Sequence, residues 1–248
     1  MSDLPPDVAE VISRYLDLID RAAPGHLAAL YLVGSLALGD YRPGSSDVDF
    51  VAVTEGEVDP VGLAAVHEAL RPPMNVDGVY VTAADLAADP ETVGERPQAF
   101  EGRVTVGPAF EINPAVWQTL AQGPIVVRGE PPQVTVDPVR LAAWTRGNLD
   151  TYWRQCRDGV AALPAELVDD TVVVWCGLGP ARLVHTLETG RVTSKRGAGE
   201  WALRTRGDSA ILREALTLRG GGRSAYEAPA DRQRDLVIHM DVLLGGVQ

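Results

Sequence analysis

The sequence predicts an α+β protein with two parts: an N-terminal α/β domain built on a mixed sheet, and an all-helical C-terminal domain. Short apolar runs with strand spacing alternate with helical patterns in the first half of the chain. The second half carries helix start and stop signals without strand alternation. The run from Gly129 to Pro132 (GEPP) separates these two patterns, and it sets the predicted domain boundaries at 1–132 and 133–248.

Helices and strands alternate in the predicted N-terminal domain. Pro5 and Pro6 precede a segment whose apolar residues recur at helical spacing, which is typical of an amphipathic helix. The remaining predicted elements are helices at Pro60–Leu70 and Pro114–Gln122, and strands at Leu27–Val33, Val48–Thr54, Val76–Thr82 and Ile125–Arg128. The segment from residue 85 to 114 is rich in proline, glycine and acidic residues, and we predict no element within it.

Capping signals mark the helices of the predicted C-terminal domain. These signals are a start at Asp137-Pro138 with an end near Arg157, an end at Gly190, an N-cap at Ser194 before Lys195–Leu203, and starts at Asp208-Ser209 and Asp231. None of this half alternates with the period of two that strands require. The C-terminal domain is therefore predicted to be helical throughout.

The composition narrows the class of partner. The chain has 248 residues and a formal net charge of −12, which disfavours polymeric nucleic acid because that binding rests on Lys and Arg neutralising phosphates. The same negative charge attracts a polycationic small molecule. The alternative explanation is that the acidic residues serve only solubility. No signal-peptide pattern or bilayer-length apolar run is visible. We expect a cytoplasmic monomer that binds neither nucleic acid nor a membrane.

A Gly-Ser pair and two aspartates make the stretch from Leu30 to Val53 the most informative part of the sequence. A predicted strand leads into Gly34-Ser35, and Asp47 and Asp49 stand at the start of the next strand, where side chains two apart point to one side. Two carboxylates on one side suit Mg²⁺, which takes oxygen ligands from protein and phosphate. Gly34 permits a close approach to a triphosphate, and Ser35 can hydrogen-bond it. An isolated Asp-x-Asp could instead be a solvated strand end.

This stretch resembles the Gly-Ser…Asp-x-Asp signature of the nucleotidyltransferase superfamily. The resemblance implies an enzyme that transfers a nucleoside monophosphate from a Mg²⁺-bound triphosphate to an acceptor. It also implies that Gly34, Ser35 and Ser46 bind the nucleotide, and that Asp47 and Asp49 bind the metal.

The resemblance implies a third carboxylate on a later strand, and Asp77 occupies that position. Asp77 shares the period-two face of Val79 and Val81, so its charge is out of pattern there, and a nearby cation or polar site would compensate it. We expect Asp77 to join the metal ligands and to act as the general base for the attacking hydroxyl. The alternative is a strand-edge aspartate in a turn with Gly78.

The segment Ala181–Leu203 resembles the corresponding part of the aminoglycoside (3″)(9)-adenylyltransferases, which modify streptomycin and spectinomycin. The resemblance implies that Arg182 and Lys195 bind the ATP phosphates. It further implies that Trp153 and Asp158, a Trp-x-x-x-x-Asp pair, bind the acceptor. Without the resemblance, Trp153 could equally be a tryptophan packed between helices. The C-terminal domain is thus expected to complete the ATP and acceptor sites.

Three departures from the family pattern bear on the acceptor and the base. Asp77 stands where the family usually has glutamate, Phe100–Arg103 contains no tryptophan, and Val172 occupies a family aspartate position. In the family, the last two positions serve streptomycin. We therefore favour Mg²⁺-dependent transfer of AMP from ATP to a hydroxyl of an aminoglycoside or aminocyclitol, with a spectinomycin-like acceptor favoured over streptomycin. The alternatives are a biosynthetic metabolite or protein side chain as acceptor, another nucleotide than ATP, or a catalytically silent nucleotide-binding module.

Overall fold

A computed structural model describes residues 4–70 and 74–246. The chain divides into two compact units, Met1–Asp137 and Pro138–Gln248. The sequence boundary after Pro132 thus falls slightly earlier in the chain than the division between the units. No helix among the described residues is long and apolar enough to cross a membrane.

A mixed sheet forms the centre of the first unit, as the sequence predicts. Within the described residues its strand order is β5-β4-β3-β2-β1-β6. Only β2 and β3 are parallel, whereas the other neighbours pair in antiparallel fashion. The strands are β1 (Leu27–Leu32), β2 (Val48–Thr54), β3 (Val76–Val81), β4 (Arg96–Phe100), β5 (Arg103–Gly107) and β6 (Ile125–Arg128).

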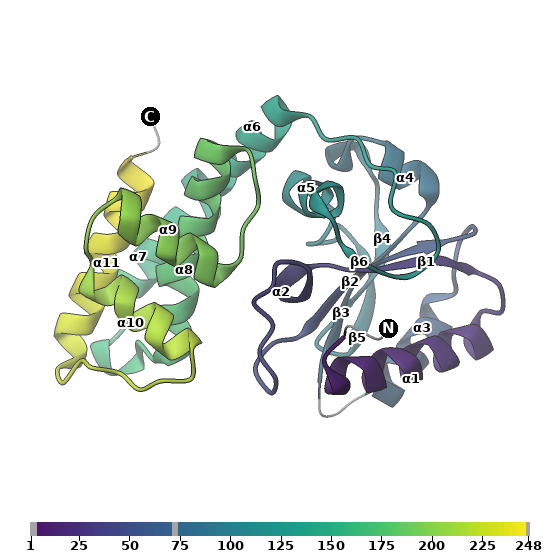
Figure 1. The fold of residues 1–248 in the computed structure, drawn as a ribbon, viewed down its shortest axis with the longest axis horizontal. Helices are drawn as coiled ribbons and strands as arrows, with labels where there is room; N and C mark the ends of the chain where they lie inside the picture. Colours follow the sequence, from purple (N-terminus) through teal and green to yellow (C-terminus); the bar gives the residue numbers. More distant parts are fainter. Residues whose placement is uncertain (1–3, 71–73, 247–248) are drawn as a thin grey trace. The chain divides into compact units, whose positions relative to one another are not determined.

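Helices cover both faces of this sheet (Figure 1). Because successive strand residues point to opposite faces, Leu30 and Leu32 pack in the core under α1 (Pro6–Ala22) and α3 (Pro60–Leu70), while Tyr31 and Val33 pack on the other side. That other side is covered by α4 (Ala83–Ala87) and α5 (Pro114–Gln122), which contribute Leu86, Trp117 and Leu120 to its core. Two short helices, α2 (Gly34–Ala37) and η1 (Pro90–Thr92), complete the unit.

The β4–β5 hairpin lies in the segment for which the sequence predicts no element. Glu101 and Gly102 both have positive φ, 48° and 71°, as in the two-residue turns that suit the twist of paired strands. Pro97 lies within β4, which is next to the edge of the sheet. Proline lowers the strand propensity of a segment, and this explains why the pattern alone missed the hairpin.

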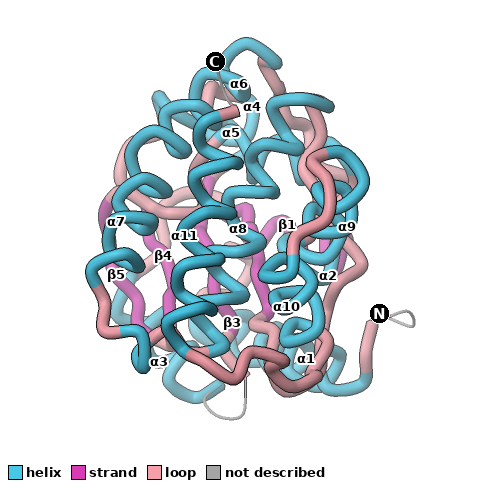
Figure 2. Tube along the Cα trace, turned by 90° about the vertical axis from the view of Figure 1, so that its left-hand side faces the viewer, coloured by secondary structure: helices cyan, strands magenta, loops and turns pink. Residues whose placement is uncertain are grey.

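The second unit is helical (Figure 2). Its elements are α6 (Pro138–Asn148), η2 (Leu149–Trp153), α7 (Arg154–Ala162), η3 (Ala165–Leu167), α8 (Asp170–Thr189), α9 (Lys195–Thr205), α10 (Ala210–Arg219) and α11 (Pro229–Gly245). Gly190 ends α8 with φ 68°, and Ser194 and Ser209 cap α9 and α10, as predicted. The helix predicted from Pro138 to about Arg157 contains a π-helical turn, η2, which periodicity did not indicate.

A chain of polar groups is buried in the first unit between the sheet and α3. The Tyr15 hydroxyl donates to the Tyr80 hydroxyl at 3.0 Å, which in turn lies 2.8 Å from Nε2 of His67. The His67 ring also hydrogen-bonds the Val76 backbone. Burial lowers the pKa of His67 from 6.5 to about 4, so this imidazole stays neutral near pH 7.

His67 should make stability depend on pH. Between pH 6.5 and 4 the unfolded chain binds a proton at His67 that the folded chain does not, so stability falls as pH is lowered through this window and is unaffected above it. The full effect amounts to about 3 kcal/mol. Urea unfolding of the native protein and of His67→Gln should therefore diverge between pH 7 and pH 5.

The difference between the two proteins is the quantity to measure, because other buried groups titrate in the same range. The pKa values of Asp77 and Glu111 are both raised to about 7, and raised carboxyl pKa values stabilise the fold as pH falls. These contributions cancel in the comparison. Parallel pH profiles for the two proteins would contradict the role of His67.

Candidate active site

Two aspartates lie side by side at the start of the parallel strands β2 and β3. Asp49 pairs in register with Asp77, and the residues two and four positions further on, such as Val51 and Val79, pack in the core beneath α4 and α5. Both carboxylates therefore belong to that face of the sheet. Asp49 is half-buried, Asp77 is buried, and Asp47, directly before β2, is exposed.

Gly34 brings the chain close to this pair. The Val33 amide donates to the Asp49 carbonyl at 2.9 Å, and Gly34 then turns with φ 58°, a conformation that residues with a Cβ adopt at a cost. A Cβ at this position would overlap the carboxylate of Asp49. Two independent constraints, the backbone angle and the lack of space, thus require glycine here.

The hydroxyl of Ser35 is buried, and it has no hydrogen-bond partner among the described residues. Burying a hydroxyl without a partner costs free energy, so this atom is suited to a polar ligand. Ser46, the other serine predicted at the nucleotide, has its hydroxyl engaged by the Arg42 backbone amide at 3.1 Å. That bond closes the turn that leads into Asp47.

Asp77 has an unusually high pKa for an aspartate. Burial is the main cause, the charge of Asp47 adds to it, and the charges of Asp49 and Glu111 contribute less, so that the pKa rises from 3.8 to about 7. The backbone amide of Glu101, in the β4–β5 turn, donates to Oδ1 of Asp77 at 3.0 Å and opposes this rise. The carboxyl group can therefore exchange a proton near neutral pH.

Glu111 is a further carboxylate at this site that sequence reasoning missed. It lies between β5 and α5, and burial raises its pKa to about 7, with a smaller contribution from the charge of Asp49. Its own backbone amide opposes the shift. Glu111 follows no periodic pattern, and only its closeness in space to Asp49 marks it.

The carboxylates fit a Mg²⁺ site that is shared with a phosphate. No three His, Cys, Asp or Glu side chains among the described residues are grouped so that they alone could hold a metal. Mg²⁺ commonly uses one or two carboxylates and takes its other ligands from water and substrate phosphates. Asp47 and Asp49, beside the unpartnered Ser35 hydroxyl, suit that arrangement. Asp77 as a third metal ligand stays a prediction.

In the helical unit, the two predicted phosphate ligands meet at the start of α9. Nε of Arg182 donates to the Thr193 carbonyl at 3.1 Å, and Lys195 is the first residue of the helix that Ser194 caps. The Lys195 ammonium lies 4.7 Å from the ring centre of Trp175. Arg182 and Lys195, thirteen positions apart in the predicted motif, are thus both held at this helix end.

Of the predicted acceptor pair, Asp158 is exposed and Trp153 is buried. Trp153 is only 4% exposed and packs on Gly179, where any Cβ would overlap its ring. The Asp158 carboxylate is exposed and pairs with Arg157 at 3.1 Å. The aromatic side chains that reach the surface beside Trp153 are Tyr152 and Trp175. The role of Trp153 and Asp158 in acceptor binding stays a prediction.

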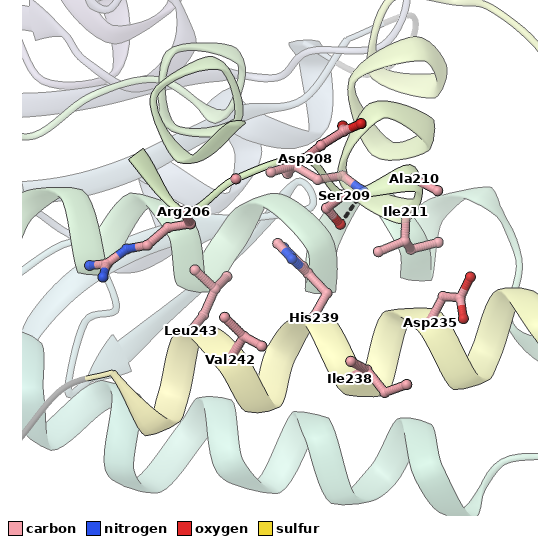
Figure 3. Close-up of a pocket in the computed structure, with 12 residues that line it drawn as sticks. Arg206, Asp208, Ser209, Ala210, Ile211, Asp235, Ile238, His239, Val242 and Leu243 are labelled. Carbon is pink, nitrogen blue, oxygen red and sulfur yellow. Dashed lines mark hydrogen bonds between the residues drawn. The ribbon is translucent and has the colours of Figure 1, made fainter. Parts of the chain in front are cut away.

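A separate cavity of about 240 Å³ lies elsewhere in the helical unit (Figure 3). It is lined by the α9–α10 connection, by the start of α10 and by one side of α11, with His239 among its walls. His239 shares a hydrogen bond of 3.0 Å with the Gly177 carbonyl, and burial lowers its pKa. None of the candidate residues named above lines this cavity.

Each unit contains a segment that matches a known protein domain. Residues 12–83 match the nucleotidyltransferase domain, and residues 148–242 match the aminoglycoside adenylyltransferase C-terminal domain. The fold is similar to the crystal structure of spectinomycin adenyltransferase AAD(9) from Enterococcus faecialis with ATP and spectinomycin, at a TM-score of 0.62 and 12% identity over 95% of this chain and 98% of that chain. No protein of curated function matches the sequence.

These matches and the fold define the protein as a nucleotidyltransferase. More particularly, it belongs to the nucleotidyltransferases that carry the aminoglycoside adenylyltransferase C-terminal domain. The fold class predicted from the sequence, a mixed-sheet domain followed by helices, is confirmed.

Replacing Gly34 tests the close approach to Asp49. Gly34→Ala should lose nucleotide binding and turnover, because the new methyl group displaces the Asp49 carboxylate, and it should also destabilise the fold by about 1–2 kcal/mol through the left-handed backbone. Gly44→Ala is the matched control, since Gly44 has φ 73° but open space around it. Titration calorimetry with MgATP and thermal unfolding would separate the two effects. Equal losses of nucleotide binding in both variants would contradict the prediction.

Proposed function

We propose that this protein transfers AMP from MgATP to a hydroxyl of an aminoglycoside or aminocyclitol, with a spectinomycin-like acceptor favoured over streptomycin. The observation that carries the proposal is the in-register pair Asp49 and Asp77, with Gly34 packed against Asp49 and followed by Ser35, whose buried hydroxyl has no partner among the described residues. The two domain matches support the same chemistry. The structure of the spectinomycin adenyltransferase with ATP and spectinomycin, which has a similar fold, supports the acceptor class.

The nucleotide phosphates are bound by two sets of residues in this proposal. Gly34, Ser35 and Ser46 supply backbone and hydroxyl contacts, and Arg182 and Lys195 supply positive charge. Asp47 and Asp49 would hold Mg²⁺, which when bound offsets the negative charge that develops on the phosphates. The pKa of Asp77 is raised by burial and by its acidic neighbours, and the carboxylates gathered here favour a cation at this position.

Asp77 is the general base of the proposed reaction. It accepts the proton of the acceptor hydroxyl while the acceptor oxygen forms a bond to the α-phosphorus, and the bond from that phosphorus to the pyrophosphate leaving group breaks. A base works best with a pKa close to the working pH. Burial, the main cause of the raised pKa of Asp77, does not depend on the charge of Asp47 and supports this role, even though aspartate is one methylene shorter than glutamate.

The acceptor is proposed to be cationic and rich in hydroxyl groups. A net charge of −12 attracts such a molecule over a distance. Asp158 exposes its carboxylate, which suits an ammonium or hydroxyl group, and Trp153 is the second residue that we propose for the acceptor site. Val172 and the segment Phe100–Arg103 lack the acidic and tryptophan side chains associated with streptomycin.

Turnover with a panel of acceptors tests the proposed function. The purified protein with ATP and Mg²⁺ should release pyrophosphate with spectinomycin or a related aminocyclitol, and much less with streptomycin. GTP in place of ATP checks the nucleotide. Release with no compound of the panel, although MgATP binds, would favour a metabolite or protein acceptor or a catalytically silent nucleotide-binding module. Failure to bind any nucleotide would contradict the proposed function altogether.

Asp47 and Asp49 should both be required for the chemical step. Asp47→Asn or Asp49→Asn removes one charged ligand of Mg²⁺ and should lower kcat by about two to three orders of magnitude, with the thermal unfolding midpoint nearly unchanged. Asp59→Asn is a suitable control, because Asp59 is an exposed carboxylate that accepts backbone hydrogen bonds at the start of α3, and asparagine can do the same. Substantial turnover by either active-site variant would exclude that residue from the metal site.

Asp77 should be needed for transfer but not for nucleotide binding. Asp77→Asn keeps an oxygen for the Glu101 amide but cannot accept the hydroxyl proton, so kcat should fall by about a hundredfold or more while the Kd for MgATP changes little. Glu111→Gln is the informative comparison, because it neutralises the other carboxylate of the site whose pKa is raised. If Glu111→Gln abolishes turnover and Asp77→Asn does not, the base is Glu111.

A further inference from the structure

Lys195 occupies a position that disfavours a cation. It is the first residue of α9, an eleven-residue helix that runs to Thr205, and the Ser194 hydroxyl accepts the Gly197 amide in the first turn. The start of a helix carries partial positive charge, so an ammonium group there is repelled unless another group compensates. A compensating group should therefore lie close to the Lys195 side chain.

Trp175 supplies that compensation. The Lys195 ammonium lies over the indole ring, 4.7 Å from its centre, where the negative face of the ring attracts a cation. Trp175 is 38% exposed and Lys195 is partly exposed, so the Lys195 side chain is only partly covered by the protein. It can therefore meet a ligand from solvent while it keeps its contact with the ring.

The indole ring is itself held in place by two residues of η2. Nε1 of Trp175 donates to the Tyr152 hydroxyl at 3.2 Å, and the Trp153 ring packs against it at a centre-to-centre distance of 5.7 Å. Trp153 is buried on Gly179 of α8. The platform under Lys195 is therefore built from the π-helical turn η2 and from α8, and it is anchored in the core of the unit.

Trp175, Gly179 and Arg182 lie on one face of α8, because residues four and seven positions apart in a helix share a face. Trp175 holds Lys195, and Arg182 is tied to the Thr193 carbonyl just before the same helix. One side of α8 thus positions both cations that are proposed to bind phosphate.

We propose that Trp175 is a positioning residue for nucleotide binding: its ring holds the Lys195 ammonium at the start of α9 before the triphosphate arrives. This inference rests on the proposed function, in which Lys195 binds the ATP phosphates. A preplaced ammonium loses less side-chain freedom when the ligand binds, so the effect appears in ATP affinity and not in the rate of the chemical step.

Substitution of Trp175 measures the effect. Trp175→Leu should raise the Kd and KM for MgATP about two- to fivefold, the range expected for an exposed cation–π contact, and should leave kcat and the acceptor KM unchanged. Trp175→Phe should retain most of the affinity, because a benzene ring also attracts cations. Trp201→Leu is the matched control, since the Trp201 ring contacts the Arg206 guanidinium at 5.6 Å and neither residue belongs to the proposed site.

A double-mutant cycle with Lys195→Met decides between positioning and direct contact. Calorimetry with a non-hydrolysable ATP analogue and Mg²⁺ should show that Trp175→Leu causes no further loss once Lys195 is methionine. Additive losses would overturn the inference, because the ring would then contact the nucleotide itself. A change confined to the acceptor KM would also overturn it and would assign the ring to the acceptor.

The same cycle separates this inference from the proposed function. Unchanged ATP affinity in Lys195→Met would remove the phosphate role of Lys195, and the inference would fall with it. Absence of AMP transfer to every aminoglycoside would overturn the proposed acceptor alone, since the calorimetry needs no acceptor. Thermal unfolding of each variant checks that a lost affinity does not come from a lost fold.

Discussion

The parallel pairing of β2 with β3 is the constraint on which the chemistry of the first unit depends. Its register places Asp49 directly beside Asp77, and a shift by one residue would send one of the two carboxylates to the opposite face of the sheet. Both strands are packed on both faces, so the register is strongly specified. The fold therefore brings like charges together on a buried strand, and burial together with these charges raises the pKa of Asp77.

Small residues make the corresponding arrangements possible in each unit. Gly34 leaves the space that the Asp49 carboxylate occupies, and Gly179 leaves the space that the Trp153 ring occupies. In both cases a large or charged side chain from a distant part of the sequence lies where a Cβ would otherwise be. The positions of Asp49 and Trp153 thus depend on the absence of a side chain at Gly34 and at Gly179.

The fold class and most element positions could be predicted from the sequence, because β2, α3, α5 and β6 have local patterns that need no distant partner. The β4–β5 hairpin could not, since Pro97 weakens its strand pattern and its register depends on β3. The Gly34-Ser35 and Asp47-x-Asp49 elements stood out through spacing alone. Their contact, and that of Asp49 with Asp77, depends on strand order, which no local pattern contains.

The site residues that sequence reasoning missed have no periodic signal. Glu111 lies in a connection, and its importance follows only from its burial and from the charge of Asp49. Trp175 is one aromatic residue in an apolar helix, and only its place under Lys195 distinguishes it. For Trp153 the sequence left both packing between helices and acceptor binding open, because the room for its ring is made by Gly179 on another helix.

The π-helical turn Leu149–Trp153 constrains the length of this part of the chain. Such a turn is equivalent to one residue inserted into an α-helix, and each residue advances the helix by about 100°. Loss of a single residue here would leave a continuous, well-formed helix, yet it would rotate Tyr152 and Trp153 relative to α6 or α7. Evolutionary drift can therefore change the identity of many exposed residues along this helix, but not their number.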